Sequence, residues 1–503
     1  MKQTRIGGLL LGGLLLGARG GVLLVSLWVS GVMGQEAASE DFSGASASLR
    51  QSLLKQVQIA EKLAPQMGVH ILELESGETV FNRAGHQLRI VASNAKLFTT
   101  AAVLDSFGPG YFLETRLMAR GGVKAGVLEG DLAVLGGGDP NISGRHHFGD
   151  PYGVFRQWAR ELLRHEIRHI EGDILLVDGL FSDDKVHASW PKEQLSKWYQ
   201  APIGALSFND NCVLVRVTPA ATVGRPLRVE LDPPLELFQI SVTGTTRASG
   251  KGAKVVIDRQ PGTHNIEVGG FLPVSAKPAE YWVTVEDPVQ YFAAALRAAF
   301  REEGITLSGR MMLSGSPPSG TWKRVTTYRS DLLTTLEVIN KRSQNFYAES
   351  LLKLLGARHC GQGDWASGIQ AVTEFVATLG IETGTFHMAD GSGLSRGNRF
   401  SPVQVTTLLR EMFFHRWGSE FMRTLPYSGE PGQSWKKRLA APPYRGNVFA
   451  KTGTLRDVSA VSGYAKARSG RTYVFSILMN GTRSNWRAKQ AQDAIVRQLI
   501  DAG

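Results

Sequence analysis

The sequence is poor in cysteine, because its 503 residues include only Cys212 and Cys360. Two cysteines cannot build a disulfide framework or a structural zinc cluster. The two side chains form either one disulfide bridge or two buried thiols, and the sequence leaves both alternatives open. The sequence also lacks a long block of lysine and arginine, zinc-finger spacing and an aromatic-glycine RNA motif. These absences argue against nucleic acid as a partner, and no motif indicates a metal ion or another cofactor.

The first 34 residues contain no acidic side chain. They hold three basic residues and two apolar stretches, over 6–16 and 20–32. This arrangement predicts an export signal with a cleavage point near Gly34. An uncleaved anchor is the alternative, because the combined apolar stretch approaches the ~20 residues that span a bilayer. No cysteine lies near this point, which excludes a lipoprotein anchor.

Export implies the periplasm or the extracytoplasmic face of a bacterial cell envelope, with membrane attachment only through an uncleaved leader. The formal net charge is +11, and loss of the three basic leader residues lowers it to +8. This moderate positive charge suits anionic polymers of the cell surface. The sequence does not indicate an oligomeric state.

The length predicts about three domains, and 43% hydrophobic with 20% charged residues is typical of globular proteins. Hydrophobic periodicity predicts a strand pair over 68–85, short β-rich segments over 112–328 and three neighbouring strands between 448 and 481. The expected helices cover 47–64, 93–107, 152–165, 289–303, 331–339, 346–358, 366–379, 401–414 and 485–501.

The N-terminal helix and strand pair have no complete core of their own, so the two ends of the chain are expected to fold together. This predicts an α/β (α+β) fold with an antiparallel sheet flanked by helices, plus an all-helical part. The domain is discontinuous, over 45–111 and 329–503. The β-rich insertion 112–328 separates the two parts. It is expected to form one or two domains, and two nested domains are the favoured arrangement.

Ser93 and Lys96 lie three residues apart at the start of the helical pattern over 93–107. Residues at this spacing share a helix face, so a Lys96 amine with a lowered pKa can take the proton of the Ser93 hydroxyl. Serine is also a favoured helix cap, and the Ser-x-x-Lys spacing occurs six times in this chain. The spacing alone therefore selects nothing.

Ser343 and Asn345 form one of two Ser-x-Asn spacings, between two helical patterns. A short connection there can aim both side chains into a cleft. The hydroxyl would relay a proton to the leaving amine, and the amide would bind substrate and Lys96. A serine that caps the following helix is the alternative.

Lys451, Thr452 and Gly453 form the single Lys-Thr-Gly of the chain, at the end of an apolar strand pattern. Lys451 and Thr452 can bind a substrate carboxylate, and Gly453 leaves room for a ligand beside the backbone. The backbone N–H groups of Thr454 and Ser93 can stabilise an oxyanion. A surface lysine before a turn is the alternative, which the preceding apolar strand does not favour.

In this order, the three motifs are those of serine acyl transferases that react with penicillin. The chain resembles class C low-molecular-mass penicillin-binding proteins, a family of D-Ala-D-Ala carboxypeptidases and endopeptidases, from about residue 45 to its end. The family also has a large insertion between its first two motifs, like the 250 residues from Ser93 to Ser343. The other stretches that carry the resemblance are LGGGDP (135–140), APIGALSFNDN (201–211), NKRSQNFYAESLLKLLG (340–356), MADGSGLSRGNRFSP (388–402) and AKTGTLRDVSAVSGYAK (450–466).

The resemblance implies that Ser93 is acylated by the penultimate D-alanine carbonyl of a peptidoglycan stem peptide, with release of terminal D-alanine and hydrolysis by water. It also implies β-lactam antibiotics as ligands and a role in cell-wall synthesis and remodelling. Some members also cut D-alanyl cross-links. Gln344 departs from the aspartate that the family commonly has, but this middle side chain is not one of the catalytic groups.

Two further segments are weaker candidates. Asp183 and Asp184 in the insertion could bind an amino group of the stem peptide, although surface acidic pairs are usually solvated. The loop DGSGLSR over 390–396 is expected to be structural, as a buried turn or cleft edge.

A β-lactamase would share the three motifs, but it commonly needs a Glu-x-x-Leu-Asn segment to activate water, and 346–450 contains none. A non-catalytic wall-binding protein of the same fold is the second alternative. Retention of all five key side chains, Ser93, Lys96, Ser343, Asn345 and Lys451, argues against it.

Overall fold

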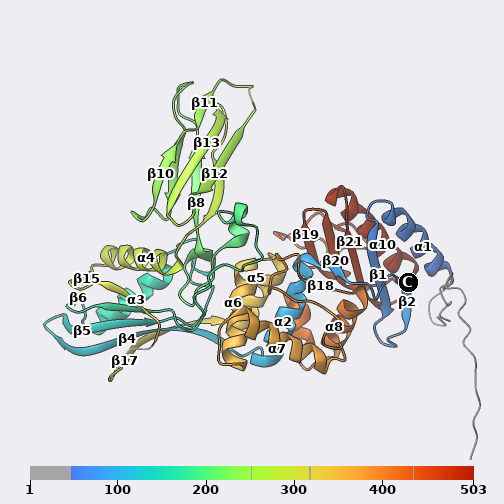
Figure 1. The fold of residues 1–503 in the computed structure, drawn as a ribbon, viewed down its shortest axis with the longest axis horizontal. Coiled ribbons are helices and arrows are strands. Elements are labelled where there is room, and N and C mark those ends of the chain that lie inside the picture. The colour runs from blue at the N-terminus through green and yellow to red at the C-terminus, as the bar shows by residue number, and fades with distance from the viewer. Residues whose placement is uncertain (1–46, 251, 317–318, 434) are drawn as a thin grey trace, which may run out of the picture. The chain divides into compact units, whose positions relative to one another are not determined.

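The computed structural model describes residues 47–250, 252–316, 319–433 and 435–503 (Figure 1). The predicted leader, residues 1–34, lies outside the described residues. None of the described helices combines the length and the apolar character that crossing a membrane requires. Cys212 and Cys360 are both free thiols, so no bridge joins them.

The helices expected from the sequence form within a few residues of their predicted bounds, and the seven-residue α9 was not predicted. The helices are α1 (Ala47–Glu61), α2 (Ala95–Phe107), α3 (Gly153–Arg164), α4 (Pro288–Glu302), α5 (Leu332–Lys341), α6 (Asn345–His359), α7 (Trp365–Thr378), α8 (Pro402–Phe414), α9 (Gly418–Thr424) and α10 (Asn485–Ala502).

Strands come from both ends of the chain and from the insertion between them. They are β1 (Gln66–Glu73), β2 (Thr79–Arg83), β3 (Arg89–Ile90), β4 (Phe112–Lys124), β5 (Val127–Leu135), β6 (His169–Ile170), β7 (Ile174–Val177), β8 (Cys212–Thr218), β9 (Arg228–Asp232), β10 (Gln239–Val242), β11 (Thr245–Arg247), β12 (Lys254–Arg259), β13 (Asn265–Pro273), β14 (Ala279–Thr284), β15 (Thr306–Leu307), β16 (Met311–Ser314), β17 (Lys323–Asp331), β18 (Arg399–Phe400), β19 (Val448–Leu455), β20 (Val458–Lys466) and β21 (Thr472–Asn480).

The two ends of the chain share one antiparallel sheet of five strands, in the order β19-β20-β21-β1-β2. The N-terminal β1 pairs with the C-terminal β21 along its whole length, from Gln66 opposite Asn480 to Glu73 opposite Tyr473. This pairing completes the core that the N-terminal hairpin lacks, as the sequence predicts.

Helices cover both faces of this sheet, which explains why β21 reads as a nearly continuous apolar run. Successive side chains of a strand point to opposite faces. Phe475 and Ile477 belong to a cluster with apolar residues of α1 and α10, whereas Val474 and Leu478 belong to a second cluster that includes α8. Figure 1 shows α1 and α10 on one side of the sheet and α8 on the other.

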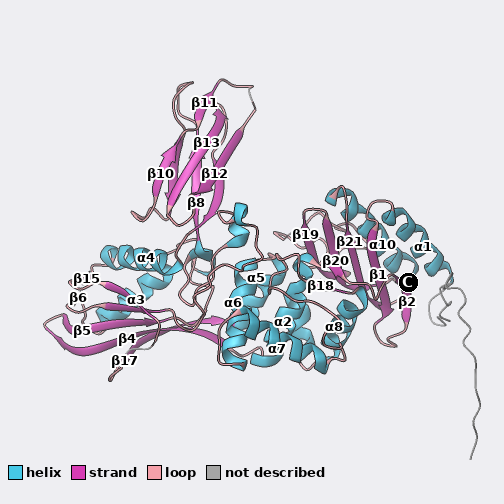
Figure 2. Ribbon diagram, viewed as in Figure 1, coloured by secondary structure: helices cyan, strands magenta, loops and turns pink. Residues whose placement is uncertain are grey.

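The helical part surrounds α2 and α6 (Figure 2). Every residue of α6 from Asn345 to Gly356 is buried, because α2, α5 and α7 all pack against it. A helix buried on all sides has no amphipathic pattern, and any polar side chain on it must find a partner inside the protein. This requirement bears on the polar residues of α6 described below.

The insertion contains a sheet with the main order β15-β6-β5-β4-β17. In addition, β7 pairs with β5, and β16 pairs with β7. Helices α3 and α4 contribute to the same hydrophobic cluster as this sheet. Two smaller sheets lie in the same region, β14-β8-β9 and β10-β13-β11 with β12 beside β13. These sheets, the five-stranded sheet and the helical part form the predicted α/β (α+β) fold class.

The exact division at 112 and 328 stays a prediction. Strand β17 runs across the second boundary and leads directly into α5, whose N-cap is Asp331. The insertion also contributes Phe181, Trp190 and Ile203 to the hydrophobic cluster of the helical part. The insertion and the helical part are therefore packed together rather than joined by a linker.

Candidate active site

Ser93 lies in a turn of 3-10 helix, Ala92–Asn94, immediately before α2. The expected helix over 93–107 therefore begins at Ala95, and neither helix start is capped by a serine side chain. Ala92 has a φ of +47°, a left-handed conformation that is rare for residues other than glycine. This turn leaves the Ser93 hydroxyl free to contact Lys96 Nζ, at 3.1 Å.

Lys96 is fully buried, and its amine has three neighbours. Nζ lies 2.7 Å from Asn345 Oδ1 and 2.6 Å from the Ser392 carbonyl oxygen, in addition to the Ser93 hydroxyl. The two carbonyl oxygens can only accept hydrogen bonds. In the neutral amine they take both N–H groups, so the lone pair faces Ser93 Oγ, as a general base requires.

The charge state of Lys96 is set by its surroundings. Burial lowers the pKa of Lys96 to about 7, although the Glu349 and Asp390 carboxylates oppose this change. Near neutral pH, a large fraction of the amine is therefore unprotonated and able to accept the Ser93 proton.

The Asn345 amide is oriented by the insertion. Asn345 Nδ2 donates to the Tyr199 carbonyl oxygen at 2.9 Å, and a carbonyl can only accept. This contact directs Oδ1 towards Lys96. Tyr199 belongs to a 3-10 turn of the insertion, Trp198–Gln200, so the insertion takes part in arranging the site.

Ser343 sits at a strained position, with a φ of +58°. Its Oγ accepts a hydrogen bond from Lys451 Nζ at 2.8 Å. The residue at the N-cap of α6 is Gln344, without a side-chain cap, so Ser343 is not the helix cap that was the alternative. Burial and the nearby Lys96 lower the pKa of Lys451, which is also fully buried.

Strand β19 brings the Lys-Thr-Gly segment against the turn that holds Ser93. Asn94 Nδ2 donates to the Lys451 carbonyl at 2.9 Å. A Cβ atom at Gly453 would lie 2.9 Å from the Ser93 nitrogen and 2.7 Å from the Val91 carbonyl oxygen, so only glycine fits. Thr452 is half-buried and Thr454 is exposed.

Glu349 is a residue of the site that the sequence analysis missed. It lies one turn after Asn345 on α6 and is fully buried. Its carboxylate accepts three hydrogen bonds, from the Ser392 nitrogen at 2.7 Å, the Gly391 nitrogen at 2.9 Å and Trp365 Nε1 at 2.9 Å. The only signal in the sequence was a glutamate within the largely apolar stretch FYAESLL of the helix.

Glu349 fixes the segment whose Ser392 carbonyl accepts from Lys96. The loop over 390–396, expected to be structural as a buried turn or cleft edge, contacts the site directly through the Ser392 carbonyl. Asp390 holds the same loop by accepting from the Gly393 and Ser395 nitrogens at 2.7 and 2.6 Å. Burial, followed by the nearby Asp390 charge, raises the pKa of Glu349.

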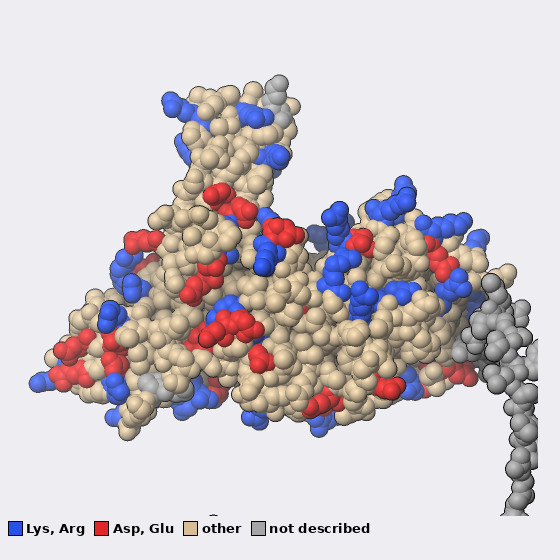
Figure 3. Space-filling model, in the orientation of Figure 1, with Lys and Arg blue, Asp and Glu red and all other residues tan. Residues whose placement is uncertain are grey.

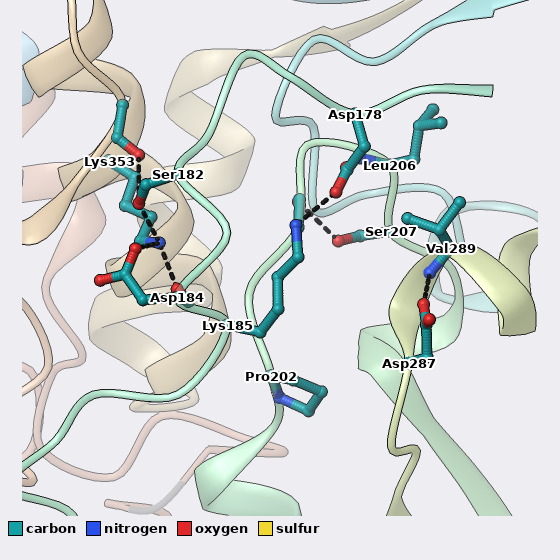
Figure 4. A network of polar contacts seen from close by, with 12 residues as sticks. Asp178, Ser182, Asp184, Lys185, Pro202, Leu206, Ser207, Asp287, Val289 and Lys353 are labelled. Carbon is teal, nitrogen blue, oxygen red and sulfur yellow. Dashed lines mark hydrogen bonds and ion pairs between the residues drawn. The ribbon is translucent and has the colours of Figure 1, made fainter. Parts of the chain in front are cut away.

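Asp183 and Asp184 are not brought to the Ser93 cluster. Figure 4 shows Asp184 beside Lys353 of α6, whose Nζ donates to the Asp184 carbonyl at 2.6 Å and to Ser182 Oγ at 3.1 Å. The Asp184 carboxylate lies 3.6 Å from the same amine. Asp183 lines a separate cavity of the insertion, next to Asp178.

Comparisons with known proteins agree with this geometry. The model of the D-Ala-D-Ala carboxypeptidase 3 (S13) family matches residues 49–501. A D-alanyl-D-alanine carboxypeptidase of Actinomadura sp. is 31% identical, over 96% of this chain and 92% of that protein. The D-alanyl-D-alanine carboxypeptidase DacB of Haemophilus influenzae is 26% identical, over 81% of this chain and 84% of that protein.

The fold is also that of a solved structure. The crystal structure of penicillin binding protein 4 (dacB) from Haemophilus influenzae superposes with a TM-score of 0.77 at 23% identity, over 87% of this chain and 97% of that one. The same protein complexed with a β-lactam superposes with a TM-score of 0.72 at 23% identity, over 88% and 98% of the two chains.

Proposed function

The chain belongs to the D-Ala-D-Ala carboxypeptidase 3 family, and from this premise we propose that it is a serine-type D-Ala-D-Ala carboxypeptidase that acts through an acyl-enzyme on Ser93. The observation that carries the proposal is the buried Lys96 amine, held by two carbonyl oxygens with its third side towards the Ser93 hydroxyl. The substrate is a peptidoglycan stem peptide.

Acylation begins when Lys96 takes the Ser93 proton and Ser93 Oγ attacks the carbonyl carbon of the penultimate D-alanine. The backbone N–H groups of Ser93 and Thr454 stabilise the resulting oxyanion. When the tetrahedral intermediate collapses, the bond to the nitrogen of the terminal D-alanine breaks. Ser343, in contact with Lys451, passes its hydroxyl proton to that nitrogen and is re-protonated by the proton that Lys96 took from Ser93. Free D-alanine leaves, Ser93 carries the ester, and Lys96 is neutral again.

Deacylation uses the same groups with water as the nucleophile. Lys96 takes a proton from water, the hydroxide attacks the ester carbon, and the bond to Ser93 Oγ breaks with return of a proton to that oxygen. The products are the shortened stem peptide and free enzyme. An endopeptidase reaction follows the same steps when the leaving amine belongs to a D-alanyl cross-link.

Substrate binding falls to residues around this centre. Lys451 and Thr452 bind the terminal carboxylate, and Asn345 binds the peptide backbone of the substrate. Gly453 leaves room for a ligand beside the backbone of the strand. It also lets strand β19 lie against the Ser93 turn, since any side chain there would collide with that turn. β-Lactams acylate the same serine, because their strained amide presents its carbonyl as the D-Ala-D-Ala bond does.

A location outside the cytoplasm is part of the proposal, as periplasmic or extracytoplasmic, in a role in cell-wall synthesis and remodelling. The leader composition and the net charge of +11 support it. Figure 3 shows Lys and Arg gathered over the surface near β19 and β20, which suits an anionic wall polymer.

Three measurements separate this function from its rivals. Release of D-alanine from a D-Ala-D-Ala pentapeptide, lost in Ser93→Ala, supports the carboxypeptidase. Many rapid turnovers of nitrocefin, rather than stoichiometric acylation, would instead favour a β-lactamase. Failure of penicillin to attach covalently would favour a non-catalytic wall-binding protein.

The substrate-selecting role of Asp183 and Asp184 stays a prediction, because the contacts of Asp184 with Lys353 also offer a structural role. Substitution of both by asparagine, with unchanged relative turnover of amidated and free diamino-acid peptides, would remove the substrate-selecting role.

A further inference from the structure

A cavity of 810 Å³ lies between the insertion and the segment that precedes α6. It adjoins the site through two neighbours in sequence. Gln344 in its wall precedes Asn345, and Trp198 in its wall precedes Tyr199, whose carbonyl accepts from Asn345 Nδ2. A ligand in this cavity would therefore lie close to the amide that contacts Lys96. Its volume is within the range of pockets for small organic ligands.

Two tryptophans form an aromatic wall of this cavity. Lys197 and Val283 form an isolated antiparallel bridge, and Trp198 and Trp282 are their neighbours in sequence. Both tryptophans line the cavity and are 44% and 46% exposed. Two partly uncovered indole rings in the wall of one cavity offer a ligand an aromatic surface.

The facing wall is polar, and two of its oxygens have no partner among the described residues. These atoms are Gln344 Oε1 and Asp210 Oδ1, both shielded from solvent. Gln344 is 9% exposed, and its Nε2 already donates to Asp210 Oδ2 at 2.8 Å. Both free oxygens accept hydrogen bonds, so they fit hydroxyl or amide N–H groups of a ligand.

Two of the three cations that line this cavity are paired. Arg145 pairs with Asp210, and Lys341 lies 3.0 Å from Glu430. The third, Arg342, is exposed and stays hydrated, so the buried part of the wall favours a neutral ligand rich in donors.

We infer that the cavity binds an N-acetylated amino sugar of the glycan strand to which the stem peptide is attached. The C–H face of a pyranose ring stacks on the indole rings of Trp198 and Trp282. Hydroxyl and acetamido N–H groups donate to Gln344 Oε1 and Asp210 Oδ1. The inference rests on the proposed function, because it assigns to the same site the part of peptidoglycan beyond the reacting D-Ala-D-Ala.

The test compares one pentapeptide with and without its N-acetylglucosaminyl-N-acetylmuramyl disaccharide. We measure kcat/KM for both and take their ratio, so that a general loss of activity cancels. The ratio is expected to favour the disaccharide-bearing substrate and to fall about 3- to 10-fold in Trp282→Ala. Trp282→Phe, which keeps an aromatic face, is expected to recover most of it.

The matched control is Trp486→Ala on α10, since Trp486 is 67% exposed and lies outside the cavity. It is expected to keep the wild-type ratio. The inference would be overturned if Trp282→Ala and Trp198→Ala showed the same kcat/KM ratio as this control. So would equal kcat/KM of the wild type for both substrates.

Direct binding of the peptide-free disaccharide, followed by tryptophan fluorescence, separates failure of the inference from failure of the proposed function. Saturable binding that is lost in Trp282→Ala is expected. Absence of binding in a protein that still releases D-alanine contradicts only the sugar site. Binding without any D-alanine release contradicts the carboxypeptidase and leaves the sugar site standing. Binding that survives in Trp282→Ala contradicts the aromatic wall as its location.

Discussion

Replacing Glu349 by glutamine is expected to slow acylation of Ser93. The carboxylate accepts three N–H groups, two on one oxygen and one, from the Ser392 nitrogen, on the other. Glutamine keeps one carbonyl oxygen and presents an NH2 group in place of the second. At least one buried N–H therefore loses its acceptor, at a cost of about 1–3 kcal/mol. The Ser392 carbonyl then holds the Lys96 amine less well. If the full cost is added to the activation barrier of acylation, the reaction slows about 5- to 150-fold.

The same substitution is expected to change the pH dependence in a defined direction. Protonated Lys96 cannot accept the Ser93 proton, so acylation rises with pH through the Lys96 pKa of about 7. In its ionised form Glu349 raises this pKa, so removal of its charge lowers it. Because the pKa of Glu349 is itself raised to about 7, this effect acts on the upper part of the acidic limb. The acidic limb of the pH profile should therefore move to lower pH in Glu349→Gln.

The assay is the second-order rate constant of acylation by a fluorescent penicillin, measured between about pH 5 and 9. Glu374→Gln is the control, because Glu374 is an exposed glutamate on the neighbouring α7. An acidic limb that stays in place or moves to higher pH would refute the electrostatic part of the reasoning. An unchanged rate would refute the positioning part.

Other substitutions test separate contacts. Asn345→Asp adds a negative charge 2.7 Å from Lys96 Nζ, so the acidic limb should move to higher pH in the same assay, opposite to Glu349→Gln. Gly453→Ala places a methyl group 2.9 Å from the Ser93 nitrogen, and penicillin acylation should fall on the order of 10²-fold, the loss of one oxyanion donor. Burial lowers the pKa of Lys353 to about 8. Between that value and the ordinary ~10.4, the unfolded chain binds more protons, so the free energy of unfolding rises with pH. Urea titrations of Lys353→Met should show a smaller rise over this range, and an unchanged slope would contradict the burial of that amine.

The grouping of the candidate catalytic residues could be predicted because short sequence spacings bring them together. Ser93 and Lys96 meet within one turn, and Lys451 follows an apolar strand whose burial the sequence makes evident. The return of the two chain ends to one sheet also follows from the sequence, since the hairpin over 68–85 had no core of its own.

The contacts that orient these residues could not be predicted, because they join distant segments. Glu349 is visible in the sequence, but its partners at 391 and 392 lie more than forty residues away. The Tyr199 carbonyl, which directs Asn345, is a backbone atom and has no signature in the side-chain pattern. The 3-10 turn before α2 depends on the left-handed Ala92, which no local preference predicts.

The most direct test of the account is the site of covalent attachment of penicillin, mapped by mass spectrometry of peptides from the labelled protein. One adduct is expected, on Ser93, and it should be absent in Ser93→Ala. Ser350→Ala is the matched control, because Ser350 and Lys353 share the Ser-x-x-Lys spacing outside the catalytic cluster. An adduct on Ser350 or elsewhere, or equal labelling of Ser93→Ala and the wild type, would contradict Ser93 as the nucleophile.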